Sequence, residues 1–196
     1  MPTIGLDNIV YSKITDGEDG ETYAAPKKLA KAIKADLTVE HVEGELYADD
    51  ALSDSAKEFK TAKLVIEVDD IGAAVAAELT GSSTDKNGVL INTSDDNAPY
   101  VAIGFRAKKS NGAYRYFWFY RGKFGVPGEN LETKGNGIKY VTKSIEGTFM
   151  RRVTTVNGKH PWKATVDSDD NGVPQSTITG WFSTVYEPEY AEVAEP

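Results

Sequence analysis

Residues 101–124 constrain the fold more than any other stretch, because they have the pattern of two strands joined by a tight turn. From Tyr114 to Phe124 aromatic side chains crowd a run that suits a pleated, half-buried strand. Residues 101–108 alternate between apolar and small or basic side chains. Asn111-Gly112 between the runs is the strongest short-range signal for a two-residue β-hairpin turn. The sequence therefore predicts an antiparallel hairpin at the centre of the protein.

The two faces of the aromatic strand differ in character. One face carries Tyr114, Tyr116, Trp118, Tyr120 and Phe124, and the other carries Arg115, Phe117, Phe119, Arg121 and Lys123. A two-residue loop would place Phe105 opposite Trp118, with Gly104 opposite Phe119. The like-charged pair of Lys108 and Arg115 counts against that register. We expect the first face to fill the core, and the second to meet either a helix at 71–79 or another subunit.

Composition is that of an ordinary soluble domain. The chain has 196 residues, 40% of them hydrophobic and 27% charged, so we expect one domain at 1–190 and a loose acidic tail at 191–196. There is no cysteine, which excludes disulfides and thiol nucleophiles. The first residues lack the pattern of a signal peptide, and no apolar run is long enough to cross a membrane. The net charge of −8 argues against a basic surface for nucleic acid.

The rest of the chain indicates a mainly β protein with one helix. Apolar alternation predicts further strands at about 8–14, 35–43, 61–68, 89–91, 138–149, 162–166 and 177–186. A change of parity within 138–149 suggests a bulge near Thr142-Lys143. The alanine-rich run 69–81 predicts a helix that Asp69 or Asp70 caps and Gly81 ends. Residues 43–60, acidic and irregular, predict a long loop in an early hairpin, and loops of that length tend to carry function.

Catalytic and metal-binding patterns are weak. Residues 167–172 begin like a calcium loop, but position 12 is Ile178 instead of a bidentate carboxylate, so a solvated turn is the better interpretation. The two histidines lie in a strand pattern and in a turn, without a nucleophile motif. Asp49 and Asp50 could act as an acid and base pair, although a solvated acidic loop is far more common. We expect no catalytic residue, no cofactor and no metal.

Several short motifs occur in an order that resembles one protein family. They are Thr3-Ile4-Gly5-Leu6-Asp7, Leu46-Tyr47-Ala48-Asp49-Asp50, Val68-Asp69-Asp70-Ile71-Gly72, Phe124-Gly125-Val126-Pro127, Glu132-Thr133-Lys134-Gly135 and Ile145-Glu146-Gly147-Thr148-Phe149. Together they resemble the major tail proteins, or tail tube proteins, of long-tailed bacteriophages of the phi13 type. The resemblance covers about residues 1 to 190.

The resemblance implies a fold and a role. The fold would be an antiparallel β-sandwich, barrel-like, with one flanking helix at about 70–80 and a long early hairpin loop. Six copies would form a ring, and rings would stack into a tube around the tape-measure protein, through which DNA passes. The protein would assemble in the host bacterial cytoplasm and reside in the virion, with no membrane contact. The long loop would reach a neighbouring subunit or ring.

Candidate assembly residues follow from the loop and the second face of the aromatic strand. They are Leu46, Tyr47, Ala48, Asp49, Asp50 and Leu52 in the loop, and Arg115, Phe117, Phe119, Arg121 and Lys123 in the strand. A further hypothesis is that acidic residues dominate the tube lumen and repel DNA weakly, so that it slides.

Two other classes of protein compete with the tail tube. A β-sandwich could bind cell-surface glycan by stacking Tyr and Trp on sugars, which requires those rings to be exposed in the monomer. A small β-hydrolase is the third possibility, but the sequence offers no nucleophile, base and acid set. The tail-tube interpretation instead predicts that the rings are buried in the core or between subunits.

Overall fold

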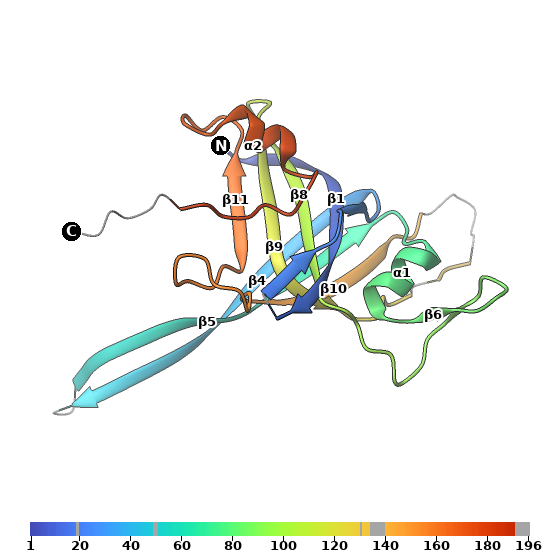
Figure 1. Cartoon of the computed structure of the whole chain (residues 1–196), viewed down its shortest axis with the longest axis horizontal. Coiled ribbons are helices and arrows are strands. Elements are labelled where there is room, and N and C mark those ends of the chain that lie inside the picture. The colour runs from blue at the N-terminus through green and yellow to red at the C-terminus, as the bar shows by residue number, and fades with distance from the viewer. Residues whose placement is uncertain (19, 49–50, 130, 134–139, 191–196) are drawn as a thin grey trace.

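The computed structural model describes residues 1–18, 20–48, 51–129, 131–133 and 140–190 (Figure 1). Its elements are β1 (Thr3–Gly17), β2 (Gly20–Tyr23), β3 (Lys27–Lys28), β4 (Ala32–Ala48), β5 (Ala51–Val68), α1 (Ala73–Thr80), β6 (Ser83–Thr84), β7 (Leu90–Ile91), β8 (Val101–Lys109), β9 (Tyr114–Phe124), β10 (Lys143–Met150), β11 (Lys163–Asp167) and α2 (Gln175–Gly180). The mainly β class is confirmed. Neither of the two described helices has the length and apolar character needed to cross a membrane. The predicted tail 191–196 lies outside the described residues.

One antiparallel sheet of nine strands builds the fold. Its order is β2-β1-β8-β9-β10-β5-β4, with β3 beside β1 and β11 beside β9. The aromatic strand β9 lies in the middle (Figure 1). β8 pairs along one edge of β9, while β11 and β10 share the other edge, at 115–119 and 121–124 respectively. The strand that dominates the sequence is thus in contact with three others.

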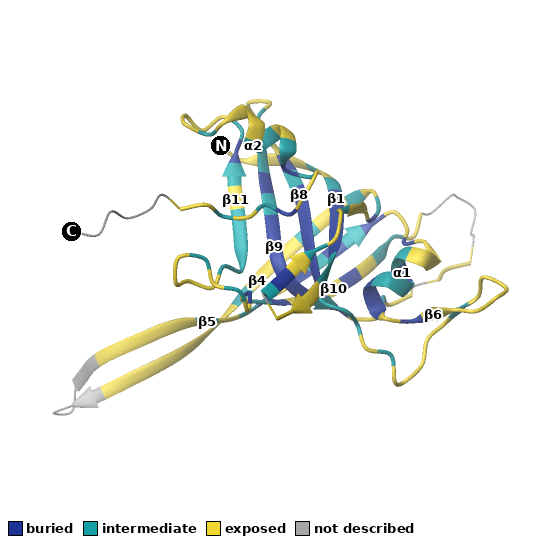
Figure 2. Ribbon diagram, in the orientation of Figure 1, coloured by how far each residue is buried: buried dark blue, intermediate teal, exposed yellow. Residues whose placement is uncertain are grey.

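The central strands are largely buried (Figure 2), and hydrophobic clusters pack on both of their faces. The sheet curls so that residues from β1, β5, β8, β9 and β10 meet with α1 in one core, which is consistent with a sandwich or barrel-like fold. On the opposite face, Tyr116, Trp118 and Tyr120 pack against the C-terminal segment through Trp181 and Val185. The Trp118 Nε1–H donates a 2.9 Å hydrogen bond to the Trp181 carbonyl.

The central hairpin is confirmed, but its predicted register is wrong by one residue. Gly104 lies opposite Trp118, and Lys108 lies opposite Tyr114 instead of Arg115. The loop has three residues instead of two: the Lys109 amide donates to the Ala113 carbonyl, and the Gly112 amide donates to the Lys109 carbonyl. Gly112 has φ of +88°, whereas Asn111 is not in the left-handed region that a type I′ turn requires. The turn therefore avoids the like-charged pair.

A bulge in β9 also changes which face its end presents. Val101 pairs with Gly122 but Ile103 pairs with Phe119, so β9 has one more residue than β8 in this interval. Phe124 consequently joins Phe119 in the larger core, not Trp118 on the opposite face. The predicted strict alternation through Phe124 is wrong for this reason.

The helix is confirmed in place but is shorter than predicted. α1 begins after Gly72, and no side chain caps it. The Asp69 carboxylate instead accepts hydrogen bonds from the Lys31 and Asp70 amides, which corrects the predicted capping role. Gly81 ends the helix in the left-handed region, as predicted, with φ of 79°.

Two predicted strands toward the C-terminus need correction. The expected strand at 177–186 is the short helix α2 followed by turns, and this segment packs Trp181 and Val185 on the face of β9 instead of pairing at a strand edge. The expected strand at 138–149 begins only at Lys143, and its residues 138–139 lie outside the described part. The change of parity near Thr142 therefore marks the start of β10 instead of a bulge. The short strand at 89–91 and the strand at 162–166 are confirmed as β7 and β11.

Candidate assembly surface

A long two-stranded ribbon extends from the body of the sheet (Figure 1). It consists of the outer parts of β4 and β5, which stay paired from Glu40 and Thr61 out to Ala48 and Ala51. The prediction of an irregular loop over 43–60 is therefore wrong. Acidic residues, serines and glycine in this segment disfavour strands intrinsically, but its pairing continues a register set in the core, where Leu64 and Ile66 are fully buried.

Residues 41–46 and 54–58 of the ribbon are exposed (Figure 2). We define the ribbon tract as residues 41–46 and 54–58. One face of the tract carries Val42 and Leu46, whose side chains are 55% and 60% exposed, opposite Glu58 and Asp54. On the other face the Lys57 ammonium forms an exposed ion pair with Glu43, and such pairs add little stability.

Most of the predicted loop candidates lie at the far end of this ribbon. Leu46 is on the exposed face just described. Tyr47 and Ala48 end β4, and Tyr47 pairs with Leu52 of β5. Asp49 and Asp50 lie outside the described residues. The structure therefore brings the described candidates together in one hairpin, in strands instead of the loop that we expected.

The candidates from β9 divide into buried and accessible residues. Phe119 is 1% exposed and packs against Phe149 in the larger core. Arg121 is 5% exposed and is enclosed by carboxylates of its own chain. Neither offers surface to a neighbour, so both predicted interface roles are corrected. Arg115, Phe117 and Lys123 are partly exposed, and Lys123 donates to the Asn97 side chain.

Sequence reasoning missed a buried ionic cluster around Arg121. Its guanidinium contacts Asp16 and Glu21 at 2.6 Å, and Glu21 also accepts from Arg152 at 3.2 Å. Arg152 continues the cluster to Glu187 in the C-terminal segment. The hydrogen bond from Arg121 lowers the pKa of Asp16. The cluster ties the β1–β2 hairpin, β9 and the C-terminal segment together. No local motif signals it, since its members come from both ends and the middle of the sequence.

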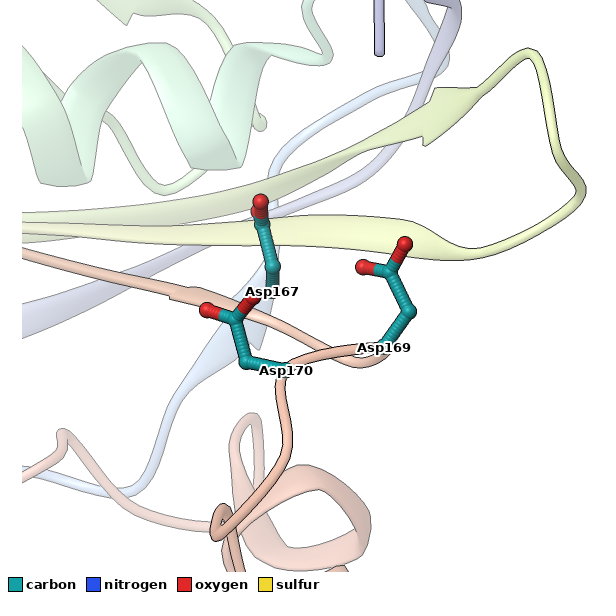
Figure 3. A group of neighbouring side chains, drawn as sticks. All are labelled: Asp167, Asp169 and Asp170. Atoms are coloured by element: carbon teal, nitrogen blue, oxygen red, sulfur yellow. The ribbon is translucent and has the colours of Figure 1, made fainter.

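Three aspartates cluster at the end of β11 and in the turn that follows, where the sequence suggested a solvated loop (Figure 3). They are Asp167, Asp169 and Asp170, and one carboxylate oxygen from each lies within 4.8 Å of the others. The Lys109 ammonium lies 3.0 Å from Asp167 and 2.6 Å from Asp169, and Arg115 binds Asp167 through two nitrogens at 2.6 Å. The bonds from Arg115 and Lys109 lower the pKa of Asp167 to about 2. The chain's own cations, Lys109 and Arg115, pair with Asp167 and Asp169, so these ion pairs are a structural tie between β8, β9 and β11.

The two histidines lie in different environments. His41 lies opposite Phe59 on the ribbon. The His160 Nδ1 is 2.8 Å from the Arg152 carbonyl oxygen, in the loop before β11.

Comparisons with known proteins do not assign the chain to a family. No family model matches the chain, and no curated protein sequence matches it. Among solved structures, a chain of the cryo-EM structure of the anti-feeding prophage baseplate, six-fold symmetrised, aligns with a TM-score of 0.40 and 8% identity. The alignment covers 85% of this chain and 96% of that chain. A likeness at that level has no weight for function.

Proposed function

We propose that this protein is a structural subunit of a bacteriophage tail, and specifically that it builds the tail tube. Six copies form a ring, and rings stack around the tape-measure protein into a tube that DNA crosses. Assembly takes place in the host cytoplasm, and the product is part of the virion. The ordered motifs that resemble phage major tail proteins support this proposal. The observation that carries it is the ribbon of β4 and β5, which projects into solvent without a described partner.

An isolated two-stranded ribbon is only marginally stable in water, and its outer strand edges invite pairing with another chain. The ribbon tract also exposes Val42 and Leu46 on one face. Both features favour a ribbon that packs against another protein molecule. A contact between unlike surfaces of identical subunits closes into a ring or continues into a filament, depending on its rotation. A tube needs both kinds of contact, one that closes the ring and one that continues from ring to ring.

We further propose that the role is not catalytic. The histidines, the usual bases of hydrolytic triads, are separated between the ribbon and the loop before β11. The competing glycan-binding function requires exposed aromatic rings. The Tyr116, Trp118 and Tyr120 rings are buried under the C-terminal segment, which weighs against sugar stacking on this strand.

A shortened ribbon tests this function. Replacing residues 43–57 with Asn-Gly leaves Val42 and Glu58 as the closing pair of a two-residue hairpin. We expect the shortened protein to fold as a monomer with the same unfolding midpoint as the wild-type protein. Negative-stain microscopy should show no rings or tubes. As a control, Glu43→Ala with Lys57→Ala removes the exposed ion pair and keeps the ribbon, so assembly should persist. Normal tubes from the shortened chain would contradict the role of the ribbon.

A further inference from the structure

A slot opens between two strand edges on the body of the molecule. Its volume is about 530 Å³, and its walls are Thr3–Leu6 of β1 and Ile33–Ala35 of β4. Phe105 and Phe117 are among the residues that line it. The segment Thr3–Asp7 pairs with β8 on one side, and β4 pairs with β5 on one side. Among the described residues no strand pairs with the other edge of either segment, so the curled sheet is open here.

An exposed isoleucine stands on each wall of the slot. In β1 the register steps past Ile4, because Thr3 and Gly5 pair with the consecutive residues Lys109 and Lys108. In β4 it steps past Ile33 in the same way. Bulges re-aim side chains and interrupt an edge. The two isoleucines are 67% and 48% exposed, and both line the slot. A slot of mixed lining, with an exposed isoleucine on each bulged wall, suits the insertion of apolar side chains from another element.

A lysine lies beside the slot on the side of Phe117. Arg115 lines the slot and is partly exposed, but its guanidinium is paired with Asp167. The Lys163 ammonium lies 5.6 Å from the centre of the Phe117 ring, and no carboxylate of the described residues lies within ion-pair distance of it. Burial and the nearby Arg115 lower the pKa of Lys163. An occupant that combines apolar side chains with carboxylates would match this slot.

The ribbon tract has that combination on one face. Val42 and Leu46 lie on β4, and their partners across the ribbon are Glu58 and Asp54. Over the tract, Glu43, Glu45, Asp54 and Glu58 oppose the single lysine Lys57. At Gly44, between the two apolar residues, even an added Cβ would meet no heavy atom within 4 Å, so the backbone there is open for close approach.

The ribbon cannot reach the slot of its own chain. Val42 lies nine residues from Ile33 along the same strand, which is about 30 Å at the usual rise per residue. We infer that the slot receives Val42 and Leu46 from the ribbon of a second copy, with Glu58 or Asp54 of that copy beside Lys163. Donor and acceptor are different surfaces of one chain, so the contact propagates head to tail. This inference rests on the proposed function and assigns the surface that the ribbon meets.

Chemical cross-linking tests the contact directly, because the chain contains no cysteine. Mixing Leu46→Cys with Ile33→Cys under assembly conditions and adding a short bis-maleimide should give covalent dimer in several-fold excess over either variant alone. Val89→Cys, at an exposed apolar position outside the slot, replaces Ile33→Cys as the matched control and should give only background. Equal yields with the control would overturn the assignment of the slot.

A complementation experiment gives a second readout. Ile33→Asp blocks the acceptor, and Leu46→Asp blocks the donor. Each variant alone should need at least about tenfold higher concentration to assemble, since burying a carboxylate against apolar side chains costs more than the ~1.4 kcal/mol of a tenfold change. Mixed together they should form one-to-one dimers that do not grow, because one intact donor and one intact acceptor remain. Circular dichroism checks that both variants fold.

The outcomes separate this inference from the proposed function. If the wild-type protein forms tubes and Ile33→Asp forms them equally well, the slot assignment is wrong and the tail-tube function stands. If the wild-type protein never self-associates, both are wrong. Tubes from wild type and Val89→Asp, with dimers from the mixed donor and acceptor variants, support both.

Discussion

At the scale of single residues, the packing of one tryptophan ring explains why the centre of the sheet needs a glycine. Gly104 lies under the Trp118 ring, and a Cβ there would approach three ring atoms at 2.9 Å. The sequence indicated that an aromatic residue covers this glycine but selected Phe119, because the register depended on the loop length. The one extra residue in the turn therefore places Gly104 opposite Trp118 instead of Phe119.

Gly104→Ala should therefore destabilise the fold. We expect a loss of about 1–3 kcal/mol in the free energy of unfolding, because Trp118 is fully buried and has no room to retreat. Urea unfolding followed by tryptophan fluorescence measures it. Gly128→Ala adds the same methyl group where nothing lies within 4 Å, and its stability should be unchanged. Equal effects at the two positions would refute the packing explanation.

Asp167 gives a pH prediction at the same scale. Its folded pKa of about 2 is below its ordinary value of 3.8, so the ion pair stabilises the protein above pH 4 and that contribution is lost as the pH falls toward 2. Asp167→Asn should lower stability at pH 7 by about 1–2 kcal/mol and flatten the acid limb between those values. Denaturant titrations at several pH values test this. Asp170→Asn, which breaks none of the bonds to Lys109 or Arg115, should retain the acid limb.

At the scale of elements, the sequence predicted correctly those helices, strands and turns that are held by interactions between residues close in the chain. The hairpin of β8 and β9, the end of α1 at Gly81 and the strand β11 follow from turn chemistry, capping and alternation. The ribbon did not, because its strands are held by a register that begins in the core and not by their own composition. The C-terminal segment was misassigned as a strand, because its apolar pattern fits equally well a segment of helix and turns that packs on the face of the sheet.

The C-terminal segment should be essential to the fold. Trp181 is buried against Tyr116 and stacks on Tyr186 with ring centres 4.9 Å apart. Trp181→Ala should cost about 3–5 kcal/mol, since it leaves a cavity over the aromatic row of β9. Thermal or urea unfolding measures the change. Tyr190→Ala removes an exposed aromatic side chain from the same segment and should stay within about 0.5 kcal/mol of wild type. A small loss at Trp181 would mean that the segment covers the sheet without stabilising it.

At the scale of the whole molecule, the chain combines a packed core with strand edges that pair with no other strand among the described residues. The buried cluster of Arg121, Glu21 and Arg152 fixes the body, while the ribbon tract and the slot face solvent. The sequence predicted Leu46 as an assembly residue, and the structure places it exposed on the ribbon, while its role in assembly stays a prediction. The slot could not be predicted, because it exists only where β1 and β4, distant in sequence, approach one another. The acidic lumen stays a prediction that a potential map of the assembled tube would test.

Negative-stain microscopy of the concentrated wild-type protein tests whether the chain builds a tail tube. We expect rings of uniform diameter with six-fold averages, and tubes built from them. The tubes should be absent when the ribbon is shortened. A protein that stays monomeric at every attainable concentration and at both low and high salt would contradict the claim.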